Sequence, residues 1–155
     1  MSPLDSRALL AAQEVERDWR QVCRHLADAQ SVAPEAGRPE AAFVALALDH
    51  AYQAFESVLL RVERGLALPA RQGSDWHRAL LADAAQAVEG LRPRLVPPQV
   101  EGDWATLLGF RHFLRHAYAA ELDPAHLGAL VAHLEAAVSA TDPVVRAMVT
   151  ALRIL

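Results

Sequence analysis

Apolar residues recur at spacings of three and four along most of this chain, in stretches separated by prolines and glycines. Such spacing places apolar side chains on one face of an α-helix, and no stretch shows the strict alternation that predicts a half-buried strand. The expected helices span about residues 4–30, 40–64, 75–91, 103–120, 123–139 and 142–155. We therefore expect an all-α fold, an antiparallel bundle of about five to six helices in a single domain over residues 1–155.

Proline positions divide the second half of the chain. Asp123-Pro124 and Asp142-Pro143 each match a helix start. An N-cap aspartate accepts a hydrogen bond from a free backbone N–H, and proline suits the first helical position. Residues 92–99 contain three prolines and cannot form regular helix, because proline lacks the backbone donor and restricts the preceding residue. We expect these residues to connect two helices.

Composition excludes several classes of protein. Apolar residues make up 53% of the chain, but the longest strongly apolar run, residues 41–48, is far too short to cross a bilayer. The N-terminus lacks the basic region, apolar core and cleavage site of a signal peptide. The single cysteine, Cys23, can form no internal disulfide and is expected as a small buried apolar residue. We expect a cytoplasmic protein that does not bind membranes.

The net charge of −4 argues against a protein that coats nucleic acid non-specifically, because phosphate binding is driven by clustered positive charge. All 15 basic residues are arginine. A nucleic-acid site would therefore have to be a local cluster of arginines, and DNA is not an expected partner.

One segment of the fourth expected helix carries most of the chemistry: residues 111–118, with the sequence Arg-His-Phe-Leu-Arg-His-Ala-Tyr. At about 100° per residue, Leu107, Phe110 and Leu114 form the expected core-facing stripe. Arg111 and His116 lie about 140° apart on an arc of polar residues beside that stripe. We expect this arc, which also contains His112, Arg115 and Tyr118, at the rim of the helix surface.

Three interpretations of this polar arc are open. It can be a solvated face with incidental charges. It can be a metal site, because His112 and His116 are spaced as two zinc ligands on one helix face. A third ligand would have to come from Glu121, Asp123 or His126. It can also be a metal-independent phosphoryl-transfer site, in which His116 transfers protons and Arg111 supplies a fixed cation. Their separation around the helix then favours a second subunit across a two-fold axis.

The segment resembles the Arg-x4-His signature of HEPN-domain ribonucleases. With Tyr118 it resembles the longer Arg-x4-His-x-Tyr form of HepT-type toxins. Residues 73–81 resemble the stretch that precedes the third helix of a HepT-like family. Tyr52, Phe55 and Glu56 resemble part of that family's second helix. The resemblance extends over about residues 40–155.

This resemblance implies an all-α homodimer that cleaves RNA at a cleft between its subunits, with the ribose 2′-hydroxyl as nucleophile. It implies no cofactor and no metal. By this resemblance His116 is the general acid/base, and Arg111 clamps the scissile phosphate. His112, in the polar position after the arginine, assists or orients.

The resemblance also implies a partner. HepT-type toxins are commonly encoded beside an MntA-like nucleotidyltransferase antitoxin that attaches AMP to the tyrosine of the motif, here Tyr118. The rival hypothesis is a catalytically silent HEPN-type binding or regulatory subunit of such a nucleotidyltransferase. A further rival is a helical interaction protein with no connection to RNA.

The remaining conspicuous side chains are expected to be structural. Trp19, Trp76 and Trp104 are typical of core or helix-junction packing. His77 is expected to make a hydrogen bond near the start of its helix rather than to line a cleft.

Overall fold

The structure, a computed structural model, describes residues 2–116 and 121–155. Within these residues the chain is all-α, as predicted, with no strand and a single isolated bridge between Val88 and Arg92. The α-helices are α1 (Pro3–Gln30), α2 (Arg38–Gly65), α3 (Trp76–Ala84), α4 (Glu101–His116) and α5 (Pro124–Arg153). Short 3-10 turns, η1 (Pro34–Ala36) and η2 (Pro98–Val100), precede α2 and α4. No helix in the described part is long and apolar enough to span a membrane.

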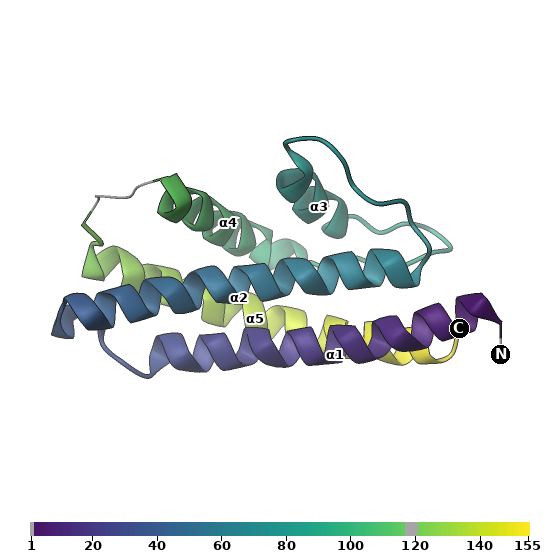
Figure 1. The fold of residues 1–155 in the computed structure, drawn as a ribbon, viewed down its shortest axis with the longest axis horizontal. Coiled ribbons are helices and arrows are strands. Elements are labelled where there is room, and N and C mark those ends of the chain that lie inside the picture. The colour runs from purple at the N-terminus through teal and green to yellow at the C-terminus, as the bar shows by residue number, and fades with distance from the viewer. Residues whose placement is uncertain (1, 117–120) are drawn as a thin grey trace.

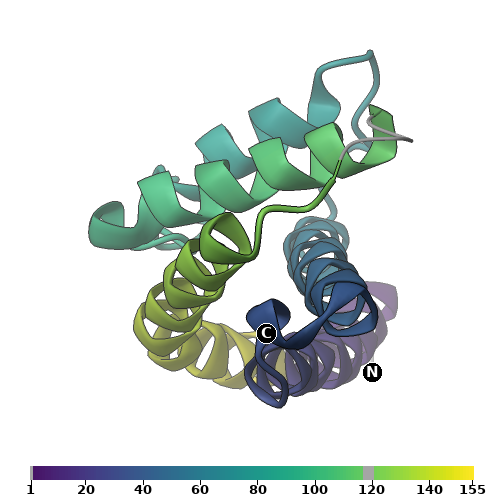
Figure 2. The ribbon, with the colours of Figure 1, turned by 90° about the vertical axis from the view of Figure 1, so that its left-hand side faces the viewer.

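Three long helices form the base of the fold. Helices α1 and α2 lie antiparallel along the length of the molecule (Figure 1), and α5 packs against both. Seen from the end, α1, α2 and α5 surround a common core, and α4 closes the side between α2 and α5 (Figure 2). The short α3 lies beside α4 and above the second half of α2.

Aromatic packing holds α4 on this base. The rings of Phe55 and Trp104 stack with their centroids 3.7 Å apart, and Tyr52 meets Trp104 edge-on at 6.2 Å. The indole N–H of the buried Trp104 donates to the Thr141 hydroxyl of α5 at 3.1 Å. Trp19 is also buried and donates to Asp142 at 2.8 Å. Both tryptophans therefore have the packing role that was expected.

The last two expected helices are one. Helix α5 runs unbroken from Pro124 to Arg153 with Pro143 inside it, so the predicted boundary at residue 142 is wrong. Asp142, expected as an N-cap, instead accepts hydrogen bonds from Trp19 on α1 and from Arg146 one turn later. Thr141 and Val145, two residues before and two residues after Pro143, are both buried. Tertiary contacts thus hold the helix together where the local sequence favours a start.

Helix α3 is shorter than predicted and ends at Ala84, not near residue 91. The chain leaves the helix because other donors satisfy its last carbonyls. The buried guanidinium of Arg92 donates to the carbonyl oxygens of Asp83 and Gln86 at 2.9 and 2.7 Å. The backbone N–H groups of Leu95 and Val96 both donate to Ala84. Residues 85–97 are therefore an ordered connection rather than helix.

Cys23 is half-buried rather than fully buried, and it packs against the core. Burial raises the pKa of its thiol above the ordinary value. The side chain therefore favours the neutral thiol, in keeping with the expected apolar role.

Gly65 allows the end of α2 to lie close to α1 and α5. A Cβ at this last residue of α2 would lie 2.6 Å from the Ala11 Cβ of α1 and 3.2 Å from Leu152 of α5. Gly65→Ala should therefore push packed helices apart and lower the free energy of unfolding in urea by about 1–3 kcal/mol.

The matched control is Gly128→Ala in α5, where an added Cβ meets nothing within 4 Å. Alanine favours helix over glycine, so this variant should gain up to about 1 kcal/mol. Equal stabilities of the two variants would contradict the close approach of α1, α2 and α5 at Gly65.

Candidate functional site

Arg111 is buried, which corrects the expectation that it lies at the rim of α4. Only 6% of the residue is exposed. Around the helix axis Arg111 falls at about 340°, between Leu107 at about 300° and Trp104 at about 360°. Both of these neighbours are fully buried. The buried face of α4 is therefore centred closer to Trp104 than the sequence pattern indicated, and it includes Arg111.

Two carboxylates of α2 surround the buried guanidinium. Arg111 Nε lies 3.6 Å from Asp49 Oδ1, and Arg111 Nη1 lies 3.6 Å from Glu56 Oε1. Asp49 and Glu56 are seven residues apart, so about two turns of helix place them on the same face. No described residue accepts a hydrogen bond from Arg111 Nη1. Charge thus holds the guanidinium near both carboxylates, and its Nη1 is buried without a hydrogen-bond acceptor among the described residues.

Glu56 also contacts α3. Its Oε2 lies 2.7 Å from Nδ1 of His77, and Glu56 itself is only 5% exposed. The ring of Trp76 stacks on that of His77 with a centroid distance of 3.6 Å. One buried carboxylate therefore connects α2 to residues of both α3 and α4.

A groove of about 400 Å³ lies between the start of α3 and α4, and we call it the α3–α4 groove. Its described lining is Ser74, Asp75, His77, Arg78, Leu81, Ala105, Leu108, Gly109, Arg111, His112 and Arg115. Arg78 and Arg115 are exposed and form no ion pair with any described residue. The groove thus combines free cations with imidazoles, which suits a phosphate-bearing ligand.

The structure brings together some of the motif residues and not others. Arg111 and His112 both line the α3–α4 groove, whereas His116 is not among its described lining residues. His112 and His116 are exposed, and their ring centroids lie 4.6 Å apart. Tyr118 lies outside the described residues. Within residues 2–116 and 121–155, no three histidine, cysteine, aspartate or glutamate side chains gather as a set that could hold a metal.

Asp49, Glu56 and His77 join this site, and none of them was predicted as a site residue from the sequence. The missed signal was a pair of carboxylates two turns apart within the apolar stripe of α2. A carboxylate at such a position needs a buried partner. His77 does make the expected hydrogen bond near a helix start, but it also lines the cleft.

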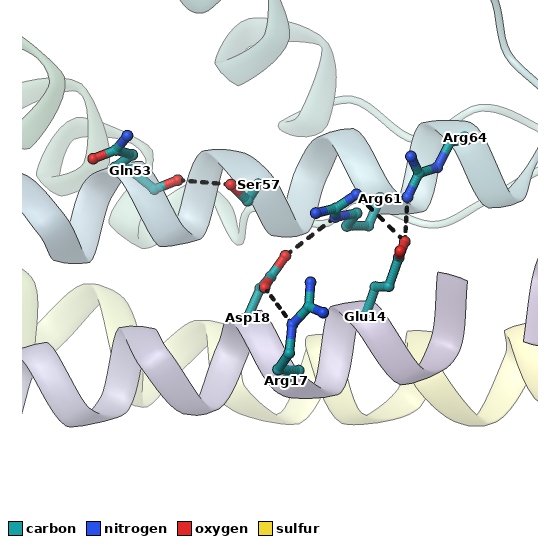
Figure 3. Close-up of polar contacts among 7 residues, drawn as sticks. All are labelled: Glu14, Arg17, Asp18, Gln53, Ser57, Arg61 and Arg64. Atoms are coloured by element: carbon teal, nitrogen blue, oxygen red, sulfur yellow. Dashed lines mark hydrogen bonds and ion pairs between the residues drawn. The ribbon is translucent and has the colours of Figure 1, made fainter. Parts of the chain in front are cut away.

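A second and larger cavity, of about 590 Å³, lies near the end of α2 and also contains arginines. Acidic side chains already pair with those arginines. Arg61 contacts Glu14 and Asp18 of α1 at 3.5 and 3.3 Å, and Arg64 contacts Glu14 (Figure 3). Arg71 holds Glu63 through two hydrogen bonds. The α3–α4 groove, with its free cations, is therefore the better candidate for binding an anion.

Comparison with known protein families assigns the chain to one family. Residues 43–152 match the family of HepT-like proteins, a span that includes most of α2, all of α3 and α4, and nearly all of α5. No curated protein and no solved structure matches the chain. The match covers well over half of the sequence and includes every described residue of the α3–α4 groove. The chain therefore belongs to the HepT-like protein family, a HEPN-type toxin family, and its all-α fold is the HEPN fold.

Proposed function

We propose that this protein is the endoribonuclease toxin of a toxin–antitoxin pair, and that it cleaves RNA without a metal. The observation that carries the proposal is the α3–α4 groove. There Arg111 is fixed by two carboxylates next to the free cations Arg78 and Arg115. Family membership supports the same reaction class.

The chemistry follows from the charges in the groove. In RNA cleavage the 2′-oxygen attacks the phosphorus, the bond to the 5′-oxygen breaks, and a 2′,3′-cyclic phosphate and a 5′-hydroxyl result. Negative charge develops on the phosphoryl oxygens, and the guanidinium of Arg111, which lines the groove, stabilises it. His116 serves as general acid/base, and His112, beside it at 4.6 Å, assists or orients it.

A homodimer completes the site in this proposal. Arg111 faces α2, whereas His116 is exposed and away from the groove lining, so one subunit leaves the two groups apart. The first turns of α2 and the last turn of α4 lie at the same end of the molecule (Figure 1). They carry exposed apolar side chains, Phe43 and Leu46 on α2 and Phe113 on α4. A two-fold interface over this end would bury them beside the motif.

Light scattering should therefore report twice the mass of the 16.9 kDa chain at micromolar concentration. Phe113→Asp should shift the protein to monomer, because a buried carboxylate at the interface would lack a partner. Leu10→Asp is the control and should leave the dimer intact. It changes an exposed apolar residue in the first turns of α1, which lie at the other end of the molecule (Figure 1). A parent chain that is monomeric would contradict this assembly.

Cleavage of RNA should persist in excess EDTA and disappear in His116→Ala. Because His116 is exposed, its loss should change the free energy of unfolding by no more than about 0.5 kcal/mol. The activity of this variant therefore reports chemistry rather than folding. Cleavage at the parental rate would overturn the role of His116.

Arg111 needs a different substitution. Arg111→Ala would leave the buried Glu56 and the half-buried Asp49 without their cation, which costs about 3–5 kcal/mol of folding stability. Arg111→Lys keeps the charge but loses the planar fork of donors. It should stay folded by circular dichroism and lose most RNA cleavage. Full activity would show that the guanidinium does not bind the phosphate.

The silent regulatory subunit remains the second candidate, and a specific observation favours it. The two carboxylates beside Arg111 offset its charge, and the whole chain is acidic, with a net charge of −4. If the purified parent cuts no RNA and does not arrest growth when expressed, this candidate replaces the ribonuclease.

In the proposed pair, a nucleotidyltransferase antitoxin attaches AMP to Tyr118. The added phosphate can occupy Arg115 or Arg111 as a substrate mimic and neutralise the groove. Co-expression with a nucleotidyltransferase encoded in the neighbouring gene should add one adenylyl group by intact-mass analysis. Tyr118→Phe should escape both modification and control while it remains active.

Tyr52 provides the internal control for this modification. It is 1% exposed, and burial, followed by the Glu56 carboxylate, raises the pKa of its phenol, so it remains neutral and inaccessible. Peptide mapping that finds AMP on Tyr52, or an unmodified chain, would leave inhibition to partner binding alone.

A further inference from the structure

Two histidines of the described chain contact a carboxylate of another helix at short distance. His77 Nδ1 lies 2.7 Å from Glu56, and His133 Nδ1 lies 2.6 Å from Asp103. Only His77 lines a cavity that also holds Arg111. The two contacts have nearly the same length, but Glu56 is buried whereas Asp103 is half-buried.

Hydrogen bonding determines which ring nitrogen of His77 is free. A carboxylate only accepts hydrogen bonds, so Nδ1 donates to Glu56 and the neutral ring carries its lone pair on Nε2. No described residue forms a hydrogen bond with Nε2. The side chain is 34% exposed, and Trp76 stacks on one face of the ring. His77 is thus an oriented base that is open to the groove.

The same carboxylate sets the position of the cation. Glu56 contacts His77 through Oε2 and Arg111 through Oε1, and it is itself buried. A proton acceptor and a phosphate-binding cation are therefore held relative to each other by one side chain of α2. A reaction at phosphorus needs such a base and cation in a fixed relation, and one subunit supplies both.

We infer that His77 is a catalytic residue of the α3–α4 groove and that Glu56 is its positioning residue. The inference rests on the proposed ribonuclease function. His77 Nε2 takes the proton of the 2′-hydroxyl as the 2′-oxygen forms its bond to phosphorus. The bond from phosphorus to the 5′-oxygen breaks, its electron pair leaves with that oxygen, and His116 of either subunit supplies the proton.

The test measures single-turnover cleavage of an RNA oligonucleotide in EDTA by three variants. His77→Ala removes the base. His77→Gln can still donate to Glu56 but cannot accept a proton. Each should lose about 100-fold or more in rate, the usual range for a general base. The matched control is His133→Ala, which breaks the equivalent pair away from the groove and should cleave like the parent.

Three further measurements separate a catalytic role of His77 from a structural one. Added imidazole should restore part of the activity of His77→Ala, because the small base can enter the space left by the ring. Binding of the same oligonucleotide with a 2′-deoxy sugar at the cleavage site, which cannot react, should be unchanged in His77→Gln. Glu56→Asp should retain more activity than Glu56→Gln, because it keeps the charge that orients the imidazole.

The results that would contradict the role of His77 differ from the result that would contradict the ribonuclease function. Parental cleavage rates in His77→Gln overturn the role of His77 and leave the ribonuclease intact. Loss of oligonucleotide binding in His77→Gln, or no response of His77→Ala to imidazole, makes His77 structural and also overturns the inference. Absence of cleavage by the parent removes the ribonuclease and the inference together.

Discussion

The buried carboxylate of Glu56 connects the three helices that surround the candidate site. An ionised carboxylate removed from water is costly unless charges and hydrogen bonds compensate it. Here Arg111 of α4 and His77 of α3 supply that compensation from two directions. The positions of α3 and α4 on the base of long helices are therefore coupled to the electrostatic balance at one residue of α2.

For anion binding, the positions of the unpaired arginines matter more in this protein than its net charge. The chain has a net charge of −4, yet Arg78 and Arg115 line the α3–α4 groove without a described carboxylate partner. Along α1 and α2 the opposite holds, since Glu14 and Asp18 pair with Arg61 and Arg64 (Figure 3). Pairing thus leaves the larger cavity with neutralised arginines and the groove with free ones. An acidic protein can in this way present a local site for an anion.

The HepT-like family match and the geometry contribute different things. Family membership places the chain among HEPN-type toxins, whereas the structure separates two residues of the motif, Arg111 and His116. Arg111 turns inward to α2, and His116 stays at the surface. Such a division between core and surface suits a site shared by two subunits. The structure also places His77 in the same groove as Arg111, which no sequence motif indicates.

Hydrophobic periodicity by itself determined the helical class, the extents of α1 and α2 to within a few residues, and the helix that carries the motif. Tertiary structure alone decided the continuity of α5 through Pro143, the early end of α3 at Ala84, and the burial of Arg111. Periodicity reports the face that a helix buries on average. Which polar side chain that face can include depends on partners distant in sequence, because a charge is buried only where another helix brings the opposite charge to it.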